Sequence, residues 1–537
     1  MVKRIHGLER CCLLEFARYR LKSAKCEAIP FLSALSALAT KIIFVLYNSA
    51  VKLIQKGLLR MTSQLFPTFE EMLHPDTIAP EIRVKAQRMR TQDPLDPVNL
   101  FNINWHRPTT EDEGRQTGTT TSVPHPPSSI NYFVMPHELT GVDAEIVVMV
   151  AKDFPTGSHK VGPAYSVMVE KYVTGEIEPG KHTLVFPSTG NYGIGGSWVG
   201  PRAGFKSMVI LPAGMSKERF EKIERYGATY TKTYGSESNV KEIYDECNRL
   251  QREHGQTMKI MNQFSEMGNY RFHWHVTGNT IVELEKELSQ KLGTRGISAF
   301  CSSMGSAGTI AAGDRLKQVF PHCKIVGLEP VQCPTLFNNG YGSHEIQGIG
   351  DKHVTWIHHV TNMDALACID DLESLKVLQV LTDPKGGEVL IKQFGVKPDD
   401  ACDIAGIFGI SGVCNLLGAI KTAKHFGLGK HDVIVIPATD NNDRYQSTMQ
   451  WMAETHGSID QNLAVRYIDG IVHNQKTDWI QDGTPENRRR WHNLKYYTWV
   501  EQQGKSVEEL DAQLSEDWWN MHQEMTQTIN DKIKALR

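Results

Sequence analysis

The sequence lacks any arrangement of cysteines that would bind zinc or form a disulfide framework. Its ten cysteines are scattered over 537 residues, and none forms a Cys-x-x-Cys pair. This usage predicts free thiols in a reducing compartment, and therefore a cytoplasmic location. No metal site is expected, because the histidines of His273-Trp274-His275 and His358-His359 have no nearby carboxylate at helical i, i+4 spacing.

An excess of positive charge is also missing, which removes the usual reason to expect nucleic acid as a partner. The 58 Lys and Arg residues are balanced by 61 Asp and Glu residues, for a net charge of −3. The basic run Arg488-Arg489-Arg490 stands beside Trp491. We interpret it as a helix surface or a subunit contact rather than a platform for nucleic acid.

One apolar run, Phe31 to Tyr47, is too short and too charged to be a clear membrane span. It has 17 residues with Lys41 near the middle, whereas a bilayer core of about 30 Å needs about 20 apolar residues. The run lies in a basic leader, residues 1–60, with eleven Lys or Arg and three Glu. This composition is typical of a mitochondrial transit segment. The alternative is an extension outside the folded enzyme, with Met61 as a natural start, and no firm membrane partner is expected.

Changes of composition divide the rest of the chain. Residues 61–129 are predicted to be a helical segment that ends in a linker, because Arg107 to Ser129 is rich in Thr, Pro, Gly and charge. Residues 130–448 form the predicted core domain, with a smaller subdomain at about 165–280.

The last part of the chain, residues 449–537, is predicted to be a folded, helical extension. It holds six of the ten tryptophans, a density that a disordered tail does not have. Ser506-Val507-Glu508-Glu509 is a candidate capping box, which predicts a final helix running from there toward the end of the chain.

Short apolar runs alternate with amphipathic segments across the predicted core. The runs are 146–150, 183–186, 208–211, 297–300, 325–328 and 433–436, and the clearest helical patterns are Lys217–Tyr226 and Asn279–Leu292. Continuous apolar runs are typical of parallel strands that are buried on both faces. The alternation therefore predicts an α/β fold with open, mostly parallel sheets flanked by helices.

Lys160 is the leading candidate for a catalytic residue. It ends the run Phe154-Pro155-Thr156-Gly157-Ser158-His159-Lys160, a turn-forming stretch between a predicted strand and an apolar helical pattern. A lysine buried in such a place loses its proton more readily and can form a Schiff base with an aldehyde cofactor.

Two glycine-bearing loops follow other predicted strands. The loop Gly305-Ser306-Ala307-Gly308-Thr309 precedes a helix, so its small residues and the helix N-terminus suit a phosphate. It has neither a Walker A lysine nor the spacing of a dinucleotide fingerprint. In Ser188-Thr189-Gly190-Asn191, hydroxyls, backbone amides and a side-chain amide converge, which suits a carboxylate or a phenolic oxygen. Either loop alone could be an ordinary strand–helix turn.

Together the three segments resemble the fold-type II pyridoxal-phosphate (PLP) enzymes, specifically the cysteine synthase and cystathionine β-synthase family, over roughly Ile130 to Thr448. Further similar stretches are Val326–Pro330, His344–Gly350, Gly409–Gly412 and Arg444–Thr448. The resemblance implies a tryptophan synthase β-like fold and a homodimer. It also implies the site: Lys160 forms the Schiff base, Asn191 contacts the cofactor's 3′ oxygen, Gly305, Ser306, Ala307, Gly308 and Thr309 bind its phosphate, Ser411 faces the pyridine nitrogen, and Ser188, Thr189, Gly190 and Gln263 hold the substrate carboxylate.

The implied activity is β-elimination or β-replacement on a β-substituted L-amino acid, with cysteine or an O-activated serine as substrate. A neutral Ser411 makes the ring a weaker electron sink than a carboxylate would, which suits rapid loss of a β-substituent. The residues Val161-Gly162 and Tyr192 differ from those that the family usually has at these positions, so we expect the shape of the pocket to differ as well. Two alternatives remain open: a serine or threonine deaminase, and a catalytically retired PLP-binding scaffold.

Overall fold

The computed structural model describes residues 66–108, 129–188, 190–235 and 239–537. The chain divides into two compact units, residues 1–61 and 62–537, and all described residues belong to the second. Three features of the sequence lie outside the described residues: the basic leader with its apolar run, most of the linker 107–129, and Thr189. None of the helices described in the structure is long and apolar enough to cross a membrane.

The larger of two sheets has seven strands in the order β1-β2-β10-β7-β8-β9-β11. Neighbouring strands from β2 to β9 run parallel, and the edge strands β1 and β11 are antiparallel to their neighbours. The strands are β1 Tyr132–Val134, β2 Glu145–Val150, β7 Ala299–Ser303, β8 Lys324–Pro330, β9 Ala365–Ile369, β10 Val433–Ala438 and β11 Ile480–Asp482. The central position of β10 explains why all of its residues are buried.

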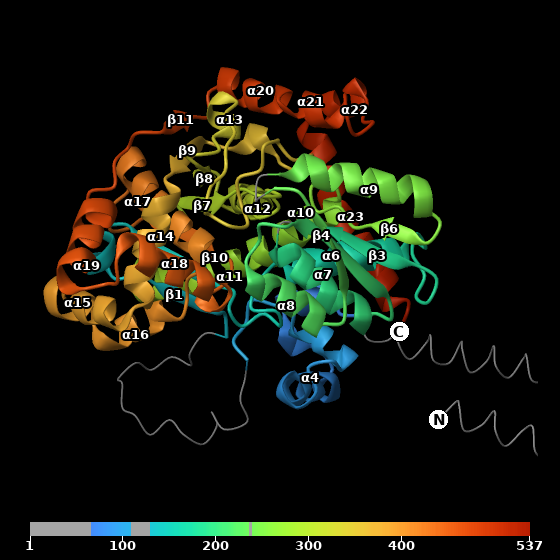
Figure 1. The fold of residues 1–537 in the computed structure, drawn as a ribbon, viewed down its shortest axis with the longest axis horizontal. Helices are drawn as coiled ribbons and strands as arrows, with labels where there is room; N and C mark the ends of the chain where they lie inside the picture. The colour runs from blue at the N-terminus through green and yellow to red at the C-terminus, as the bar shows by residue number, and fades with distance from the viewer. Residues whose placement is uncertain (1–65, 109–128, 189, 236–238) are drawn as a thin grey trace, which may run out of the picture. The chain divides into compact units, whose positions relative to one another are not determined.

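Both faces of this sheet are covered by helices, so its strands need apolar residues at every position. Val433 and Val435 of β10 pack in one core cluster with residues of α12 (Ile310–Val319). The alternate residues Ile434 and Ile436 pack in a second cluster with residues of α14 (Asp371–Thr382) and α17 (Ile410–Phe426). Alternate side chains of β10 therefore belong to two cores, one on each face of the sheet. Strand β10 and the helices α12, α14 and α17 are labelled in Figure 1.

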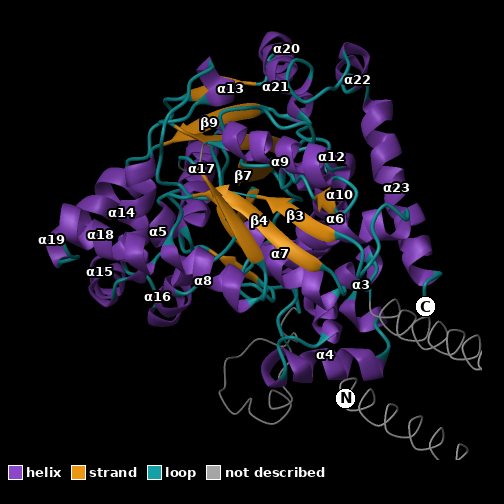
Figure 2. Cartoon of the chain, turned by 45° about the vertical axis from the view of Figure 1, so that its right-hand side comes forward, coloured by secondary structure: helices purple, strands orange, loops and turns teal. Residues whose placement is uncertain are grey.

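The smaller sheet has four parallel strands in the order β5-β4-β3-β6. Its strands are β3 Thr183–Pro187, β4 Lys206–Pro212, β5 Thr229–Thr233 and β6 Met258–Ile260, and its helices are α7 Asn191–Arg202, α8 Lys217–Arg225 and α9 Val240–His254. Val209 of β4 packs with Ile194 of α7, whereas the next residue, Ile210, packs with Ile243 of α9. The helices thus cover opposite faces of this sheet (Figure 2). The predicted α/β fold with two mostly parallel sheets is confirmed.

The remaining α-helices complete the two layers and the ends of the described chain. They are α3 Phe69–Leu73, α4 Pro80–Gln92, α5 His137–Thr140, α6 Val161–Val173, α10 Met267–Phe272, α11 Gly278–Leu292, α13 Thr335–Asn338, α15 Pro384–Phe394, α16 Pro398–Ala405, α18 Gln446–His456, α19 Gln461–Tyr467, α20 Pro485–Asn493, α21 Lys495–Trp499, α22 Val507–Ala512 and α23 Glu516–Lys534.

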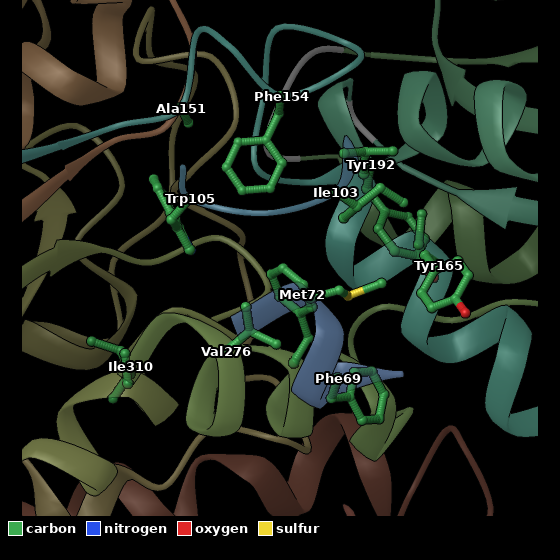
Figure 3. Close-up of a cluster of buried hydrophobic side chains, with 14 of the residues drawn as sticks. Phe69, Met72, Ile103, Trp105, Ala151, Phe154, Tyr165, Tyr192, Val276 and Ile310 are labelled. Atoms are coloured by element: carbon green, nitrogen blue, oxygen red, sulfur yellow. The ribbon is translucent and has the colours of Figure 1, made fainter. Parts of the chain in front are cut away.

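A large apolar cluster fixes the turn that carries Lys160. Phe154 at the start of the turn packs edge-on against the ring of Trp105, 4.9 Å between centroids. Tyr192 at the start of α7 and Ile310 at the start of α12 belong to the same cluster (Figure 3). The turn and the first residues of both helices therefore rest on one packed core.

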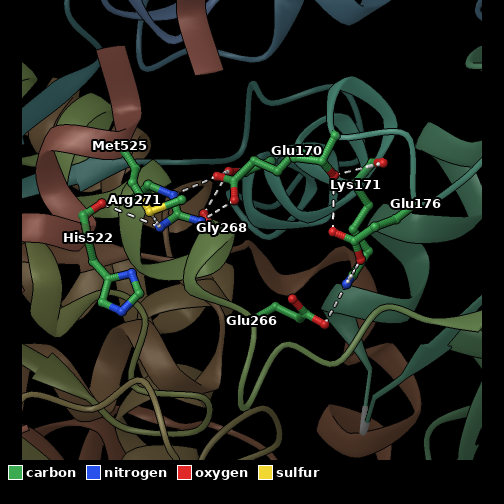
Figure 4. A network of polar contacts seen from close by, with 10 residues as sticks. Glu170, Lys171, Glu176, Glu266, Gly268, Arg271, His522 and Met525 are labelled. Atoms are coloured by element: carbon green, nitrogen blue, oxygen red, sulfur yellow. Dashed lines mark hydrogen bonds and ion pairs between the residues drawn. The ribbon is translucent and has the colours of Figure 1, made fainter. Parts of the chain in front are cut away.

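The C-terminal residues form helices that lie against the core. Ser506 and Glu509 form the predicted capping box, but the helix it opens ends at Ala512 instead of continuing. The side chain of Gln513 donates to the carbonyl of Trp356, its backbone carbonyl accepts from the indole of Trp519, and Ser515 caps the new helix α23. Farther along α23, the carbonyl of His522 accepts from Arg271 of α10, which also forms an ion pair with Glu170 of α6 (Figure 4).

Candidate functional site

The turn before Lys160 is held by the segment that follows β10. The hydroxyl of Ser158 donates to the carbonyl of Thr439 over 2.8 Å. The buried guanidinium of Arg444 donates to the carbonyl of Gly157 over 2.8 Å and also to that of Thr156. Gly157 has a φ of 71°, a conformation that favours glycine. The lysine is therefore presented by a turn whose backbone is fixed on both sides.

The amine of Lys160 points toward the glycine loop. Its Nζ donates to the hydroxyl of Ser306 over 2.9 Å. Burial of the amine lowers the pKa of Lys160 to about 8, and its place directly before α6 puts it at the positive end of a helix. A useful fraction of this amine is neutral near physiological pH, which is the state that attacks a carbonyl.

A pocket brings most of the predicted site residues together. Its lining includes the predicted residues Lys160, Ser188, Gly190, Asn191, Gln263, Gly305, Ala307, Thr309 and Ser411. Ser306 is not in the lining but bonds Lys160, and Gly308 packs against Asn269, where an added Cβ would lie 2.1 Å from Oδ1. Thr189, the remaining predicted residue, lies outside the described residues. Segments separated by more than 200 positions along the chain thus meet around one lysine.

The loop 305–309 has the properties of an anion cradle. Within the described chain, no backbone carbonyl accepts from the N–H groups of these five residues, so their donors are available to a ligand. An added Cβ on Gly305 would lie 2.6 Å from the carbonyl of Gly348, so only glycine fits where the loop approaches this carbonyl. The loop ends at the N-terminus of α12, a favourable place for a phosphate. These residues fit the phosphate end of pyridoxal phosphate.

Two neutral hydroxyls also line the pocket. Ser411 lies at the start of α17, and its Oγ is 2.7 Å from Oγ1 of Thr439. Both residues line the pocket. A serine there offers a hydrogen bond to a ring nitrogen without a formal charge.

Sequence reasoning missed Thr439 and Asp440, which follow the central strand β10. Thr439 lines the pocket, and the fully buried Asp440 bonds the side chains of Asn191 and Tyr445. The available signal was their position, because ligands bind at the carboxyl ends of parallel strands. The departure at Tyr192 is also part of the site: the residue is among those that line the pocket, and its hydroxyl donates to the carbonyl of Met261 over 3.0 Å.

The histidine before the lysine is held neutral. His159 is stacked against Trp105, and its Nδ1 lies 3.2 Å from the carbonyl of Thr439. Burial, and then the neighbouring Lys160, lower the pKa of His159 to about 3. The ring of His273 packs edge-on against that of His159, and burial lowers the pKa of His273 well below its usual value. No group of three potential metal ligands occurs among the residues that the structure describes.

Comparison with known proteins gives a consistent set of matches. Residues 146–384 match the family model described as "Pyridoxal-phosphate dependent enzyme". A cysteine synthase of Staphylococcus aureus is 29% identical over 306 residues, which are 57% of this chain and 88% of that protein. The family match contains Lys160, Asn191 and the loop 305–309, and it ends before Ser411.

Solved structures resemble the same part of the chain. A hydrogen sulfide-producing enzyme from Fusobacterium nucleatum is 25% identical, with a TM-score of 0.50 over 60% of this chain and 88% of that one. A cysteine synthase from Entamoeba histolytica, 20% identical, has a TM-score of 0.54 over 67% of this chain and all of its own. The second likeness supports the fold.

Proposed function

Because the chain is a fold-type II pyridoxal-phosphate-dependent enzyme of the cysteine synthase family, we propose that it eliminates or replaces the β-substituent of an L-amino acid, with cysteine or an O-activated serine as substrate. The observation that carries the proposal is the pocket in which Lys160, Asn191, the loop 305–309 and Ser411 meet. The S. aureus relative is a cysteine synthase, and the F. nucleatum neighbour produces hydrogen sulfide.

Each side chain has a proposed task. Bound pyridoxal phosphate makes the α-proton of an amino acid acidic and supplies the electron sink. The loop 305–309 holds the cofactor's phosphate, Asn191 faces its 3′ oxygen, and Ser411 faces its ring nitrogen. Ser188, Thr189, Gly190 and Gln263 hold the substrate's α-carboxylate.

Lys160 has two proposed tasks, anchoring the cofactor and moving the α-proton. Its low pKa suits both, because a base works best with a pKa near the working pH. The neighbouring His159 stays uncharged, since its pKa is about 3, and so does not compete for the proton.

A substrate panel tests this function. Purified protein loaded with pyridoxal phosphate is incubated with cysteine, with O-acetylserine plus sulfide, with serine and with threonine. We expect sulfide and pyruvate from cysteine, or cysteine from O-acetylserine. The control is Lys160→Ala, which should be inactive on every substrate. Release of pyruvate or 2-oxobutyrate from serine or threonine alone would instead identify a deaminase, and no product from any of the four would contradict the proposal.

The organisation around this activity completes the proposal. We propose a cytoplasmic homodimer whose catalytic core spans residues 130–448, with a smaller subdomain at about 165–280 and a helical extension at 449–537. Seven cysteines of the described chain are free thiols, which suits a reducing compartment. Light scattering gives the mass in solution, and imaging of fusions that start at Met1 and at Met61 distinguishes the cytoplasm from mitochondria.

A further inference from the structure

Residues 354–358, here called the linking segment, bond two segments that carry pocket residues. The hydroxyl of Thr355, which is 2% exposed, donates to the carbonyl of Ser306 over 2.8 Å. The N–H of Trp356 donates to the carbonyl of Phe264 over 2.9 Å, one residue after Gln263. The segment therefore contacts both the glycine loop and the strand end that carries a pocket glutamine.

The other side of the linking segment is held by the C-terminal extension. The Nζ of Lys495 donates to the carbonyls of Trp356 and His358 over 3.1 and 2.6 Å. The indole N–H of Trp499 donates to the carbonyl of Val354 over 2.8 Å. The extension thus binds three carbonyls of the segment, those of residues 354, 356 and 358, while the hydroxyl of Thr355 and the N–H of Trp356 bond Ser306 and Phe264.

Lys495 is the centre of this contact. Its side chain is fully buried, and its third bond goes to Oε1 of Gln513 over 2.6 Å, which uses all three N–H donors. Gln513 itself donates to the carbonyl of Trp356 over 3.1 Å. Burial lowers the pKa of Lys495 well below its usual value. A lysine in such a place is costly, and its bonds hold two segments in a fixed relation.

We propose that the C-terminal extension sets the affinity for the cofactor: Lys495 is a positioning residue that holds the linking segment, and through Thr355 and Phe264 the segment holds the loop 305–309 and Gln263 in their binding geometry. The inference rests on the proposed role of this loop in binding the phosphate of pyridoxal phosphate. It gives the extension a function at a site that none of its side chains lines.

The test is cofactor affinity in the full chain with Lys495→Met, which keeps the apolar stem and removes the donors. Apoprotein is titrated with pyridoxal phosphate, and the dissociation constant is read from the absorbance of the bound cofactor. We expect affinity to fall about tenfold or more, the KM for the amino acid to rise, and kcat at saturating cofactor to change by less than about twofold.

The matched control is Arg537→Met, which removes a different contact of the extension, with the N-terminal residues Phe66 and Glu71. Arg537 bonds the carbonyl of Phe66 over 2.8 Å and forms an ion pair with Glu71. We expect it to lower the melting temperature of the apoprotein while leaving cofactor affinity unchanged. Equal affinity in the Lys495→Met and Arg537→Met variants, with both melting earlier, would show that Lys495 only stabilises the fold.

Two further variants test the route. If Lys495→Met does not fold, Trp499→Phe keeps a ring but removes the donor to Val354, and affinity should again fall.

Thr355→Val removes the hydrogen bond to Ser306. If Lys495 acts through Thr355, the double variant with Lys495→Met should weaken cofactor binding by less than the product of the two single effects. A loss of affinity equal to that product would overturn the route through Thr355. Failure of the unaltered protein to bind the cofactor would overturn the proposed function as well, whereas tight binding that Lys495→Met does not weaken overturns this inference alone.

Discussion

The side-chain amide of Asn191 is held by the carboxylate of Asp440. Nδ2 of Asn191 donates to Oδ2 of Asp440 over 2.6 Å, and the hydroxyl of Tyr445 donates to the same oxygen over 2.7 Å. A carboxylate only accepts, so this contact fixes which end of the amide faces it. The Oδ1 of Asn191 is buried and has no partner among the described residues. Asp440 thus sets how Asn191 is presented in the pocket.

Replacing Asp440 by Asn should change the environment of the cofactor. The new amide can pair with either end of Asn191, so the fixed orientation is lost. We expect the absorption band of the bound cofactor to shift and kcat/KM to fall about tenfold, a loss of about 1.4 kcal/mol. Tyr445→Phe removes the other donor to Oδ2 but leaves the Asn191 contact, and should give a smaller shift. An unchanged spectrum in Asp440→Asn would contradict the positioning role.

Capture of the cofactor should depend on pH through Lys160. Burial lowers the pKa of its amine to about 8 from a usual value of 10.5, and only the neutral amine attacks the aldehyde. The rate at which apoprotein binds pyridoxal phosphate covalently should therefore rise as pH increases to about 8 and level off above it. Stopped-flow absorbance measures this rate, with free α-acetyl-lysine as the reference amine. A midpoint near 10.5 in the protein would mean that the amine is not perturbed.

The loop 305–309 should not tolerate a methyl group at Gly305, where it approaches the carbonyl of Gly348. In Gly305→Ala the new Cβ would meet the carbonyl of Gly348 at 2.6 Å, so the backbone must shift. We expect cofactor affinity to fall about tenfold or more. Gly387→Ala in helix α15 is the matched control, because nothing lies within 4 Å of its added Cβ, and it should be neutral or slightly stabilising. Titration of both apoproteins compares them, and equal affinities would argue against close packing of this loop.

Acid should destabilise the protein through histidines whose pKa is lowered in the folded chain. The ring of His353 lies among those of Tyr244, Phe264 and Trp499, and its Nε2 is 2.9 Å from the Tyr244 hydroxyl. Loss of contact with water lowers the pKa of His353 to about 3. Between pH 3 and 6.5, roughly, the unfolded chain binds a proton that the folded chain does not. Stability is therefore lost as pH falls through this window, by about 2.7 kcal/mol for one such histidine at a pH of about 4.5.

His353→Gln isolates this effect, because glutamine keeps a partner for the tyrosine but does not titrate. Urea unfolding of the apoprotein at neutral pH and at a pH of about 4.5 should show a smaller acid loss in the variant than in the unaltered chain. The same acid loss in both proteins would assign the sensitivity to other groups, such as His159, whose pKa is also about 3.

The sequence predicts the central strands well and the edges poorly. Runs such as 146–150 and 433–436 are apolar at every position because both faces of the sheet are covered. β5 is a partly exposed edge strand of alternating Thr with Tyr and Lys, and β6 has three residues. Neither carries enough apolar signal to be seen. β9, Ala365–Ile369, is buried throughout, but its alanines do not distinguish a strand from a helix.

The candidate site divides in the same way. Lys160, Asn191 and the loop 305–309 could be predicted because three such segments follow predicted strands in one chain and together resemble a known family, although either loop alone could be an ordinary turn. The position of Asp440 after a predicted strand could have marked it as a site residue, but its role could not be predicted, because that role comes from a contact with Asn191 across 249 positions. The role of Lys495 could not be predicted either, since it comes from a contact with Trp356 across 139 positions. Nothing in a local pattern distinguishes a buried lysine of this kind from an exposed one.

The most direct measurement is the identity of the lysine that carries the cofactor. Protein loaded with pyridoxal phosphate is reduced with borohydride, digested, and mapped by mass spectrometry, with Lys160→Ala and Lys495→Met treated in parallel. We expect the pyridoxyl label on Lys160 in the unaltered protein and in Lys495→Met, and no label in Lys160→Ala. A label on any other lysine, or none in the unaltered protein, would contradict the assignment of the site.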